Sequence, residues 1–448
     1  MSDVMASVAA SEPAAQPLTG HLTAFRRHRL ELLDACIDSP SDVVRLRIRT
    51  PAYLLKRAED VKRVFLDAQH LYAKDRRNIG ARANRIFGDG LMTSSGQRHR
   101  QMRERVQPAF RHDQMGPLGE VAVREVDAMV DRWGDGAEID LAGEMERFAL
   151  QSLTRSIFGV EEGPELTALQ QGVVARRHSM TRGLLAIAPL PAFLPLAVSP
   201  QRRRSLRRLD ETIARLITTR EEEGPNGDLL SFVIDAEHGE AAATDPRRVR
   251  DQALTFTLAA YENVARALTW TLLALARHPE VAHRMTREVG VVLADRPPRA
   301  EDLEALRYTR MTLAESLRLW PPNALLNRVA LSDDVLPTGT RVESGSKLIL
   351  SPYVVHRDPA YYPDPLRFDP ERFSEEQSRE RPRFSYFPFG GGPRVCIGRG
   401  LAIQQCTLAL ARLSQRVQID LAGEPASYVC GCLPDGFGPR MRATAVAS

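Results

Sequence analysis

The sequence predicts a mainly helical fold that carries a small β-rich lobe near its N-terminus. The longest helical signal covers residues 247–278, which contain neither glycine nor proline. A further helix is expected over residues 399–413, directly after a glycine-rich loop at 389–398. The alternation of residues 43–55 around Thr50-Pro51 predicts the short strands of the lobe.

Composition limits the kind of protein this can be. The 448 residues are enough for a large core, and a formal net charge of +4 gives no bulk basic character that would indicate nucleic-acid binding. Five cysteines form no disulfide framework, so a reducing cytoplasm is expected. No segment reaches the roughly 18 apolar residues of a membrane span. Residues 1–20 do not have the pattern of a signal peptide and are expected to be a disordered tail.

Helical spacing returns at residues 21–34 and 60–70, on either side of the predicted strands. A strongly basic helix is then expected over residues 96–110. His99 and Arg103 are four residues apart, so they share one face of that helix. Two cationic donors on one face suit a carboxylate group, and the alternative is a solvated basic helix.

Residues 183–198 are apolar but are interrupted by Pro189, Pro191 and Pro195. Three prolines exclude a continuous helix or a central strand here. The segment is either an exposed apolar loop or ordinary core packing. The five arginines that follow are expected to form a solvated helix face; they are Arg202, Arg203, Arg204, Arg207 and Arg208.

The long helix at 247–278 has clear end signals, because Asp245-Pro246 suits its first turn and Pro279 ends it. So long and apolar a helix should cross the centre of the molecule. Glu262 lies in its middle among apolar residues, where a carboxylate is costly unless it is paired or hydrated. Glu315 and Arg318 share one face of a later helix, where a buried ion pair would be structural.

The loop at 389–398 carries three consecutive glycines, then Pro393, Arg394, Cys396 and Gly398. Glycines at this density let the backbone pass close to a flat group. The dipole and free N–H groups at the start of the following helix favour a thiolate at Cys396. These features suit an iron ligand under a haem, and the alternative is an inert cysteine in a glycine-rich turn.

The defining positions of a known signature are filled here by Phe389, Gly390, Gly392, Arg394, Cys396 and Gly398. The chain therefore resembles the cytochromes P450. The resemblance implies one domain over residues 21–448, with the long helix above a haem b whose iron takes the Cys396 thiolate as axial ligand. It also implies a cytoplasmic, monomeric monooxygenase that uses O2 and an apolar small molecule. Electrons would come from NAD(P)H through a separate ferredoxin reductase and ferredoxin.

The same resemblance assigns roles to single residues. His99, Arg103 and Arg328 would bind the haem propionates, and Arg394 is a further cofactor-binding residue. Glu315, Arg318 and Arg372 would form a structural network behind the haem, and His356 would support the backbone nearby. A docking patch for an acidic electron donor is expected on other faces of the basic helix, at Arg98, Arg100 and Arg105.

The oxygen-activating helix of the family has a small residue, an acid and a threonine above the haem. Ala260, Glu262 and Asn263 occupy these positions, so the acid is present and the threonine is replaced. An amide donates and accepts hydrogen bonds but does not pass a proton as a hydroxyl does. Either Asn263 and ordered water replace the relay, which we favour, or proton delivery has shifted for unusual chemistry.

The resemblance also implies a substrate pocket whose candidate residues are Ala259, Ala260, Leu325, Leu326 and Phe437, and by position it matches the apolar segment 183–198 to a loop over the entrance. Cys430 and Cys432 alternate with apolar neighbours, which indicates a strand and not a metal site.

The expected reaction is hydroxylation of a secondary metabolite such as a terpenoid or polyketide. One alternative is a specialised oxidase that performs ring closure, aryl coupling, desaturation or peroxide-driven oxidation. Another is a non-catalytic haem-thiolate binding protein or sensor.

Overall fold

The computed structural model describes residues 20–48, 50–75, 88–185, 199–238, 245–423 and 439–446, together with residues 13, 15 and 84. Several expectations lie outside the described residues. They concern most of the tail at 1–20, the loop at 186–198, the pair Cys430 and Cys432, and the pocket candidate Phe437.

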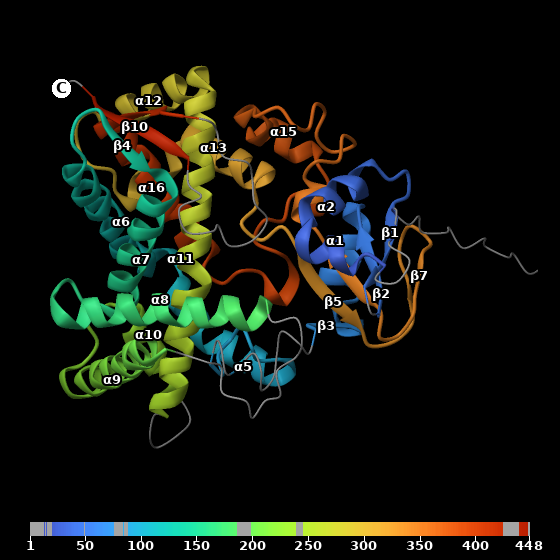
Figure 1. Cartoon of the computed structure of the whole chain (residues 1–448), viewed down its shortest axis with the longest axis horizontal. Helices are drawn as coiled ribbons and strands as arrows, with labels where there is room; N and C mark the ends of the chain where they lie inside the picture. The colour runs from blue at the N-terminus through green and yellow to red at the C-terminus, as the bar shows by residue number, and fades with distance from the viewer. Residues whose placement is uncertain are drawn as a thin grey trace, which may run out of the picture.

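Helix α11 (Pro246–Arg277) runs through the centre of the molecule, as the sequence predicts (Figure 1). It begins one residue before the expected start, and the Asp245 carboxylate caps it by accepting from the Arg247 N–H at 3.0 Å. Pro279 opens the next helix and so ends α11. Most of its residues are buried, because α7 packs along it on one side and α10, α13 and α16 touch it on others.

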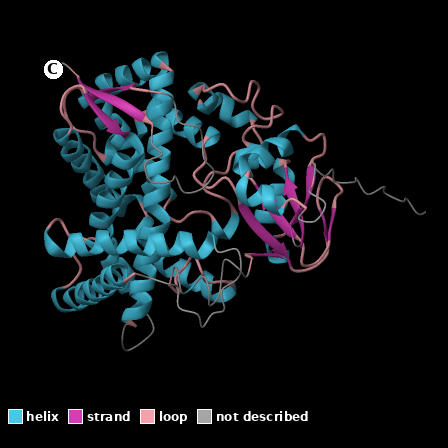
Figure 2. Cartoon of the chain, in the orientation of Figure 1, coloured by secondary structure: helices cyan, strands magenta, loops and turns pink. Residues whose placement is uncertain are grey.

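The helical part surrounds α11 (Figures 1 and 2), with α8 packed on α9 and α6 on α16. Its helices are α5 (Gly96–Val106), α6 (His112–Arg132), α7 (Leu141–Phe158), α8 (Gly163–Leu185), α9 (Pro200–Glu223), α10 (Leu229–His238), α12 (Pro279–Leu293), α13 (Arg307–Leu319) and α16 (Arg399–Arg416). Short helices are α1 (Leu22–Arg27), α2 (Arg29–Asp38), α3 (Ala58–Lys62), α14 (Pro352–Val355) and α15 (Glu375–Glu380).

A five-stranded sheet forms the β-rich lobe, which lies beside the helical part (Figure 2). Its order is β1 (Val43–Ile48), β2 (Thr50–Leu55), β8 (Lys347–Leu350), β5 (Leu326–Ala330) and β3 (Tyr72–Ala73). Only the β2–β8 pair is parallel. A second sheet has the order β4 (Ala137–Asp140), β10 (Arg440–Ala445) and β9 (Val417–Leu421), and a two-stranded ribbon pairs β6 (Asp334–Val335) with β7 (Arg341–Val342).

Two expected helices of the lobe are present but divided. Residues 21–34 form α1 and the start of α2, which are separated at His28. The helix expected at 60–70 begins as α3 and continues as a π turn (Arg63–Asp67) and a 3-10 turn (Gln69–Leu71). The strands expected at 43–55 are β1 and β2. The part of 183–198 that is described, residues 183–185, is the end of α8.

Candidate active site

Cys396 lies in the turn that leads into α16. Its N–H donates to Phe389 O at 2.9 Å and so closes the loop. Burial raises the pKa of the thiol, while the Gly398 N–H, Arg103 and Arg399 lower it. The thiol keeps accessible surface although protein surrounds most of it. An accessible sulfur with a backbone donor and two cations nearby is suited to act as a thiolate ligand.

The glycines of this loop have a second purpose that the sequence does not reveal. Gly392 has a φ of +65°, and a Cβ there would lie 1.8 Å from the main-chain oxygen of Phe65. The loop therefore packs directly on the backbone of the β-rich lobe. The close approach at Gly392 is to protein, so this glycine is required by the fold itself.

The four predicted cofactor-binding residues converge from three parts of the chain. The guanidinium groups of the three arginines donate to main-chain oxygens: Arg103 Nη1 to Val395 O, Arg328 Nη1 to Asn327 O, and Arg394 Nη2 to Ser94 O, each at 2.8 Å. His99 lies on the same turn of α5 as Arg103 and is buried. Within the described residues none of the four pairs with a carboxylate.

Burial, and then mutual repulsion, lower the pKa values of this group. Burial, followed by repulsion from Arg394, Arg103, Lys74 and Arg328 in that order, lowers the pKa of His99 to about 4. Burial also lowers the pKa of Arg328 to about 10, with Arg394 adding to the effect. The site thus gathers positive charge that the described protein groups leave uncompensated.

Lys74 belongs to this group and is not apparent from the sequence. Strand β3 pairs with β5 so that Tyr72 lies opposite Ala330 and Ala73 opposite Val329. The next position in this register places Lys74 opposite Arg328. The Lys74 ammonium donates to Met92 O at 2.6 Å, and burial lowers its pKa to about 8, followed by repulsion from Arg394 and Arg328. Sequence spacing could not have found it, because it depends on a pairing between distant strands.

These five groups, Lys74, His99, Arg103, Arg328 and Arg394, are called the cation cluster below. The cluster lies where the β-rich lobe meets α5 and the cysteine loop. Two carboxylates brought in by a ligand would offset part of its charge. The donor set and the nearby thiol of Cys396 therefore fit a haem, which carries two propionates and an iron.

Glu262 is buried, with 8% of its surface exposed, and it is paired. Its Oε2 accepts from Arg266 Nη2 at 2.8 Å, one turn along α11, and its Oε1 lies 3.6 Å from Arg177 Nε of α8. Arg177 also pairs with Glu146 of α7 at 3.0 Å. The spacing of Arg266 from Glu262 could have revealed the first partner, whereas Arg177 is distant in the sequence.

Asn263 lies on a partly exposed face of central α11. Ala259, Ala260 and Asn263 are partly exposed within a stretch that is otherwise buried, and their spacing places them on one face. Asn263 Nδ2 donates to Ala259 O at 2.5 Å, and its Oδ1 accepts from Asn323 Nδ2 at 3.3 Å. Sequence reasoning did not identify Asn323.

The predicted structural network is assembled in the structure. Arg318 donates to both carboxylate oxygens of Glu315 at 2.6 and 2.7 Å, and Arg372 Nε lies 3.6 Å from the same carboxylate. Arg318 also donates to the main-chain oxygens of His356, Pro365 and Arg367. Both charged groups of the central pair are fully buried, so the network fixes the extended segment before the cysteine loop.

His356 supports the same segment through its ring. The Phe387 N–H donates to Nε2 at 2.9 Å, so the proton is on Nδ1, which lies 3.3 Å from Arg318 O. Burial lowers the pKa of His356 well below its usual value, and the ring is therefore neutral.

The two leucines predicted to line the pocket lie in different surroundings, and the arginines predicted to form a docking patch differ in their pairing. Leu326 opens β5 and lies 3.5 Å from the Cβ position of Gly390, while Leu325 packs on the outer cluster of the lobe. On α5, Arg98 pairs with Asp89 at 2.5 Å, and Arg100 is exposed. The pairing of Arg98 reduces the charge that the expected docking patch could offer.

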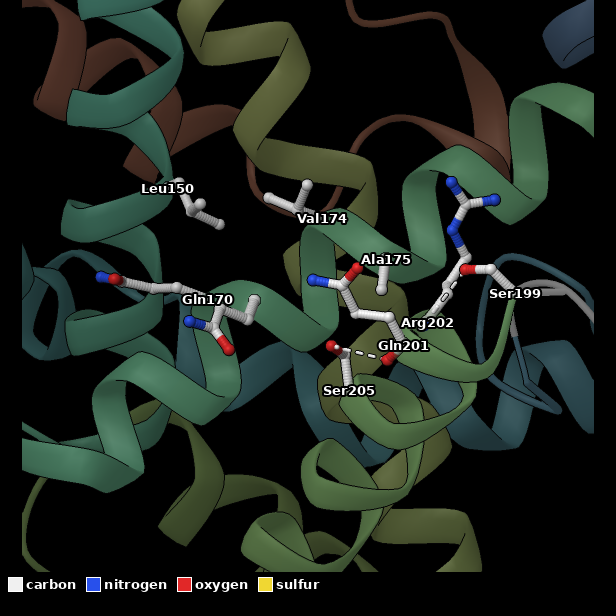
Figure 3. Close-up of a pocket in the computed structure, with 9 residues that line it drawn as sticks. Leu150, Gln170, Val174, Ala175, Ser199, Gln201, Arg202 and Ser205 are labelled. Atoms are coloured by element: carbon white, nitrogen blue, oxygen red, sulfur yellow. Dashed lines mark hydrogen bonds between the residues drawn. The ribbon is translucent and has the colours of Figure 1, made fainter.

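Two cavities in the helical part lie apart from the cysteine loop. One, of about 510 Å³, is bordered by α7, α8 and α9, and Gln170, Val174, Gln201 and Ser205 line it (Figure 3). The other, of about 360 Å³, reaches Glu146, Arg177 and Tyr261. No residue of the cation cluster lines either cavity, so neither is the candidate haem site.

The profile of the cytochrome P450 family matches residues 11–426. The chain belongs to this family, and it is accordingly a monooxygenase that uses haem b. Its fold resembles the crystal structure of the cytochrome P450DA heme domain, with a TM-score of 0.82 and 23% identity over 98% of this chain and 97% of that one. Within the described ranges, every helix is too short or too polar to span a bilayer.

Three relatives have names that state a reaction or product. Cyclooctatin synthase of Streptomyces melanosporofaciens is 35% identical over 90% of this chain and 88% of its own length. Cyclooctat-9-en-7-ol 5-monooxygenase of the same organism is 32% identical over 90% and 88%. Pentalenene oxygenase of Streptomyces avermitilis is 32% identical over 91% and 90%.

Proposed function

We propose that this monooxygenase hydroxylates an alicyclic terpenoid, either an alkene or an alkenol. The names of its relatives support this substrate class, because pentalenene is an alkene and cyclooctat-9-en-7-ol an alkenol. The partly exposed face of α11 supports it too, since Ala259 and Ala260 have apolar side chains there. A ring skeleton of carbon and hydrogen needs such a surface more than it needs hydrogen-bond donors.

The cation cluster is the observation that carries the placement of the cofactor. Its five members would hold the two propionates, and Cys396 would hold the iron. When bound, the haem supplies the activation of O2 and the oxidising power. Arg103 and Arg399 stabilise the Cys396 thiolate by charge, and the Gly398 N–H stabilises it by a hydrogen bond.

Glu262 and Asn263 have different roles in proton delivery. Glu262 can hold a proton on its carboxylate and pass it to water, while Arg266 and Arg177 keep that carboxylate in place. Asn263 cannot pass a proton, so its amide orients water or substrate. This division replaces the relay through a hydroxyl.

Electrons would reach the haem from a separate ferredoxin and its reductase. Arg98, Arg100 and Arg105 of α5 are the candidates for contacts with an acidic donor. A monomer in the cytoplasm is the state we propose.

A titration of the purified ferric protein tests the substrate class. Cyclic terpene alkenes and alkenols should shift the spin state, because an apolar ligand displaces water near the iron. Open-chain fatty acids should not. A shift with fatty acids alone would contradict the proposal. Product formation with reductases and NAD(P)H, compared with peroxide alone, then separates hydroxylation from peroxide-driven oxidation.

A further inference from the structure

The turn that follows α13 runs along one face of α11. Trp320 stacks on Trp270, with ring centroids 5.9 Å apart and planes 20° from parallel. Pro322 O accepts from Arg266 Nη1 at 3.3 Å, and Asn323 donates to Asn263 at 3.3 Å. Positions 263, 266 and 270 share a helix face, and they meet residues 323, 322 and 320 in reverse order. Three consecutive contacts therefore fix this turn against α11.

The hydrogen bonds determine the orientation of the Asn263 amide. Its Nδ2 lies 2.5 Å from Ala259 O, and the opposite orientation would place two acceptor oxygens against each other. The amide oxygen consequently faces Asn323, whose Nδ2 is the donor. The second N–H of Asn263 donates to no residue among those described.

Asn323 is held from both sides along the chain. Pro321 and Pro322 precede it, and each ring fixes its φ angle. Ala324 follows it, is 3% exposed, and accepts through its main-chain oxygen from Ser351 Oγ at 2.7 Å. The side chain of Asn323 itself is exposed, so its replacement should not unfold the protein.

We propose that Asn323 is a positioning residue that acts through Asn263. Its N–H holds the Asn263 oxygen, which leaves the second N–H of Asn263 as a donor of fixed direction beside Ala259 and Ala260. The proposal rests on the role given above to Asn263. Arg266 connects Glu262 to Pro322, so Glu262 and Asn263 both depend on the same turn.

Loss of the Asn323–Asn263 hydrogen bond should divert electrons from hydroxylation of the substrate to the formation of hydrogen peroxide. In the productive reaction O2, two electrons and two protons give one hydroxylated substrate and one water. If the Asn263 amide is free to rotate, water can take its place. The same two electrons from NAD(P)H and two protons then reduce O2 to hydrogen peroxide, and the substrate is released unchanged.

Asn323→Ala and Asn323→Asp test this in the full holoenzyme with its reductases. The ratio of peroxide to product should rise several-fold in Asn323→Ala. It should rise more in Asn323→Asp, because an ionised carboxylate is only an acceptor and faces the Asn263 oxygen. Asn323→Ser restores a donor and should recover part of the coupling. Thermal unfolding and the spin-state titration with substrate should change little in all three.

Gln377→Glu on exposed α15 is the matched control, since it also exchanges an exposed carboxamide for a carboxylate. The double variant Asn263→Ala/Asn323→Ala should lose no more coupling than Asn263→Ala alone. Additive losses would overturn the proposal, as would wild-type coupling in both Asn323→Ala and Asn323→Asp while Asn263→Ala is uncoupled. Wild-type coupling in Asn263→Ala would instead overturn the role of Asn263 itself.

Discussion

Lys74 carries a charge that no carboxylate among the described residues compensates. It lies opposite Arg328 in the sheet, with Arg394 nearby, and its own contact is to a main-chain oxygen. Like charges in opposing strand positions destabilise a sheet. Such a residue is costly in the protein without haem and useful in the protein with haem.

Lys74→Met should therefore have effects of opposite sign in the two forms. Without haem, the variant should be about 1–2 kcal/mol more stable, because relief from the burial of the charge and from repulsion by Arg394 and Arg328 exceeds the lost hydrogen bond. With haem, affinity should fall on the order of tenfold, as one charged contact to a propionate is lost. Urea unfolding of the apo-protein and haem transfer to an acceptor protein measure the two. Lys62→Met, which removes a half-exposed lysine paired with Asp67, is the control. A less stable apo-protein with unchanged haem affinity would contradict the assignment.

His99 predicts how stability depends on pH. Its pKa is about 4 in the fold against an ordinary value of 6.5, so the unfolded chain binds a proton that the folded apo-protein does not. The free energy of unfolding should fall as pH decreases from 6.5 towards 4, by up to about 3 kcal/mol. His99→Gln should flatten this dependence, and bound haem should reduce it. Equal slopes in the variant and wild-type apo-proteins would show that another group is responsible.

At the scale of elements, α13 and the extended segment before the cysteine loop are joined by one buried pair. Glu315 and Arg318 have no exposed side-chain surface, and burial raises the pKa of Glu315 against the opposing effect of Arg318. A paired buried charge is tolerated, whereas an unpaired one is costly.

Glu315→Gln keeps the shape of the side chain and leaves Arg318 without a carboxylate. It should destabilise the protein by about 3–5 kcal/mol and lower the haem content. Chemical unfolding monitored by circular dichroism checks the first effect. The control is Glu375→Gln in α15, where the exposed pair with Arg379 should contribute less than about 0.5 kcal/mol. Similar losses in the two variants would contradict the account.

Elements with a local signal could be predicted from the sequence. Helix α11 follows from an uninterrupted run between prolines, and β1 and β2 follow from alternation around Pro51. The position of β8 between β2 and β5 could not be predicted, because it joins segments far apart in the chain. The division of the 60–70 helix into π and 3-10 turns has no sequence signal that we can identify.

The candidate site divides in the same way. Cys396 lies within a contiguous motif, and the Glu262–Arg266 pair has helical spacing. Lys74 depends on the pairing of β3 with β5, and Asn323 depends on the turn that follows α13 along α11. Contacts of this kind are set by tertiary packing, which periodicity in the sequence does not encode.

At the scale of the whole molecule, the cation cluster joins the two parts of the fold. Lys74 and Arg328 come from the β-rich lobe, whereas His99 and Arg103 come from α5 of the helical part. A haem bound there would tie the lobe to the helices by charge, and the cysteine loop already does so by packing on Phe65. The cofactor would thus complete the structure as well as the site.

The reduced carbonyl spectrum of the purified protein tests directly whether the Cys396 thiolate binds the haem iron. Wild-type protein should give the band of a thiolate-ligated haem, and Cys396→Ala should lose it. Cys406→Ala is the matched control from α16, because Cys406 is buried and burial raises its thiol pKa to about 12, which leaves it a neutral core residue. We expect an unchanged band in Cys406→Ala. A thiolate-type band that persists in Cys396→Ala would contradict it.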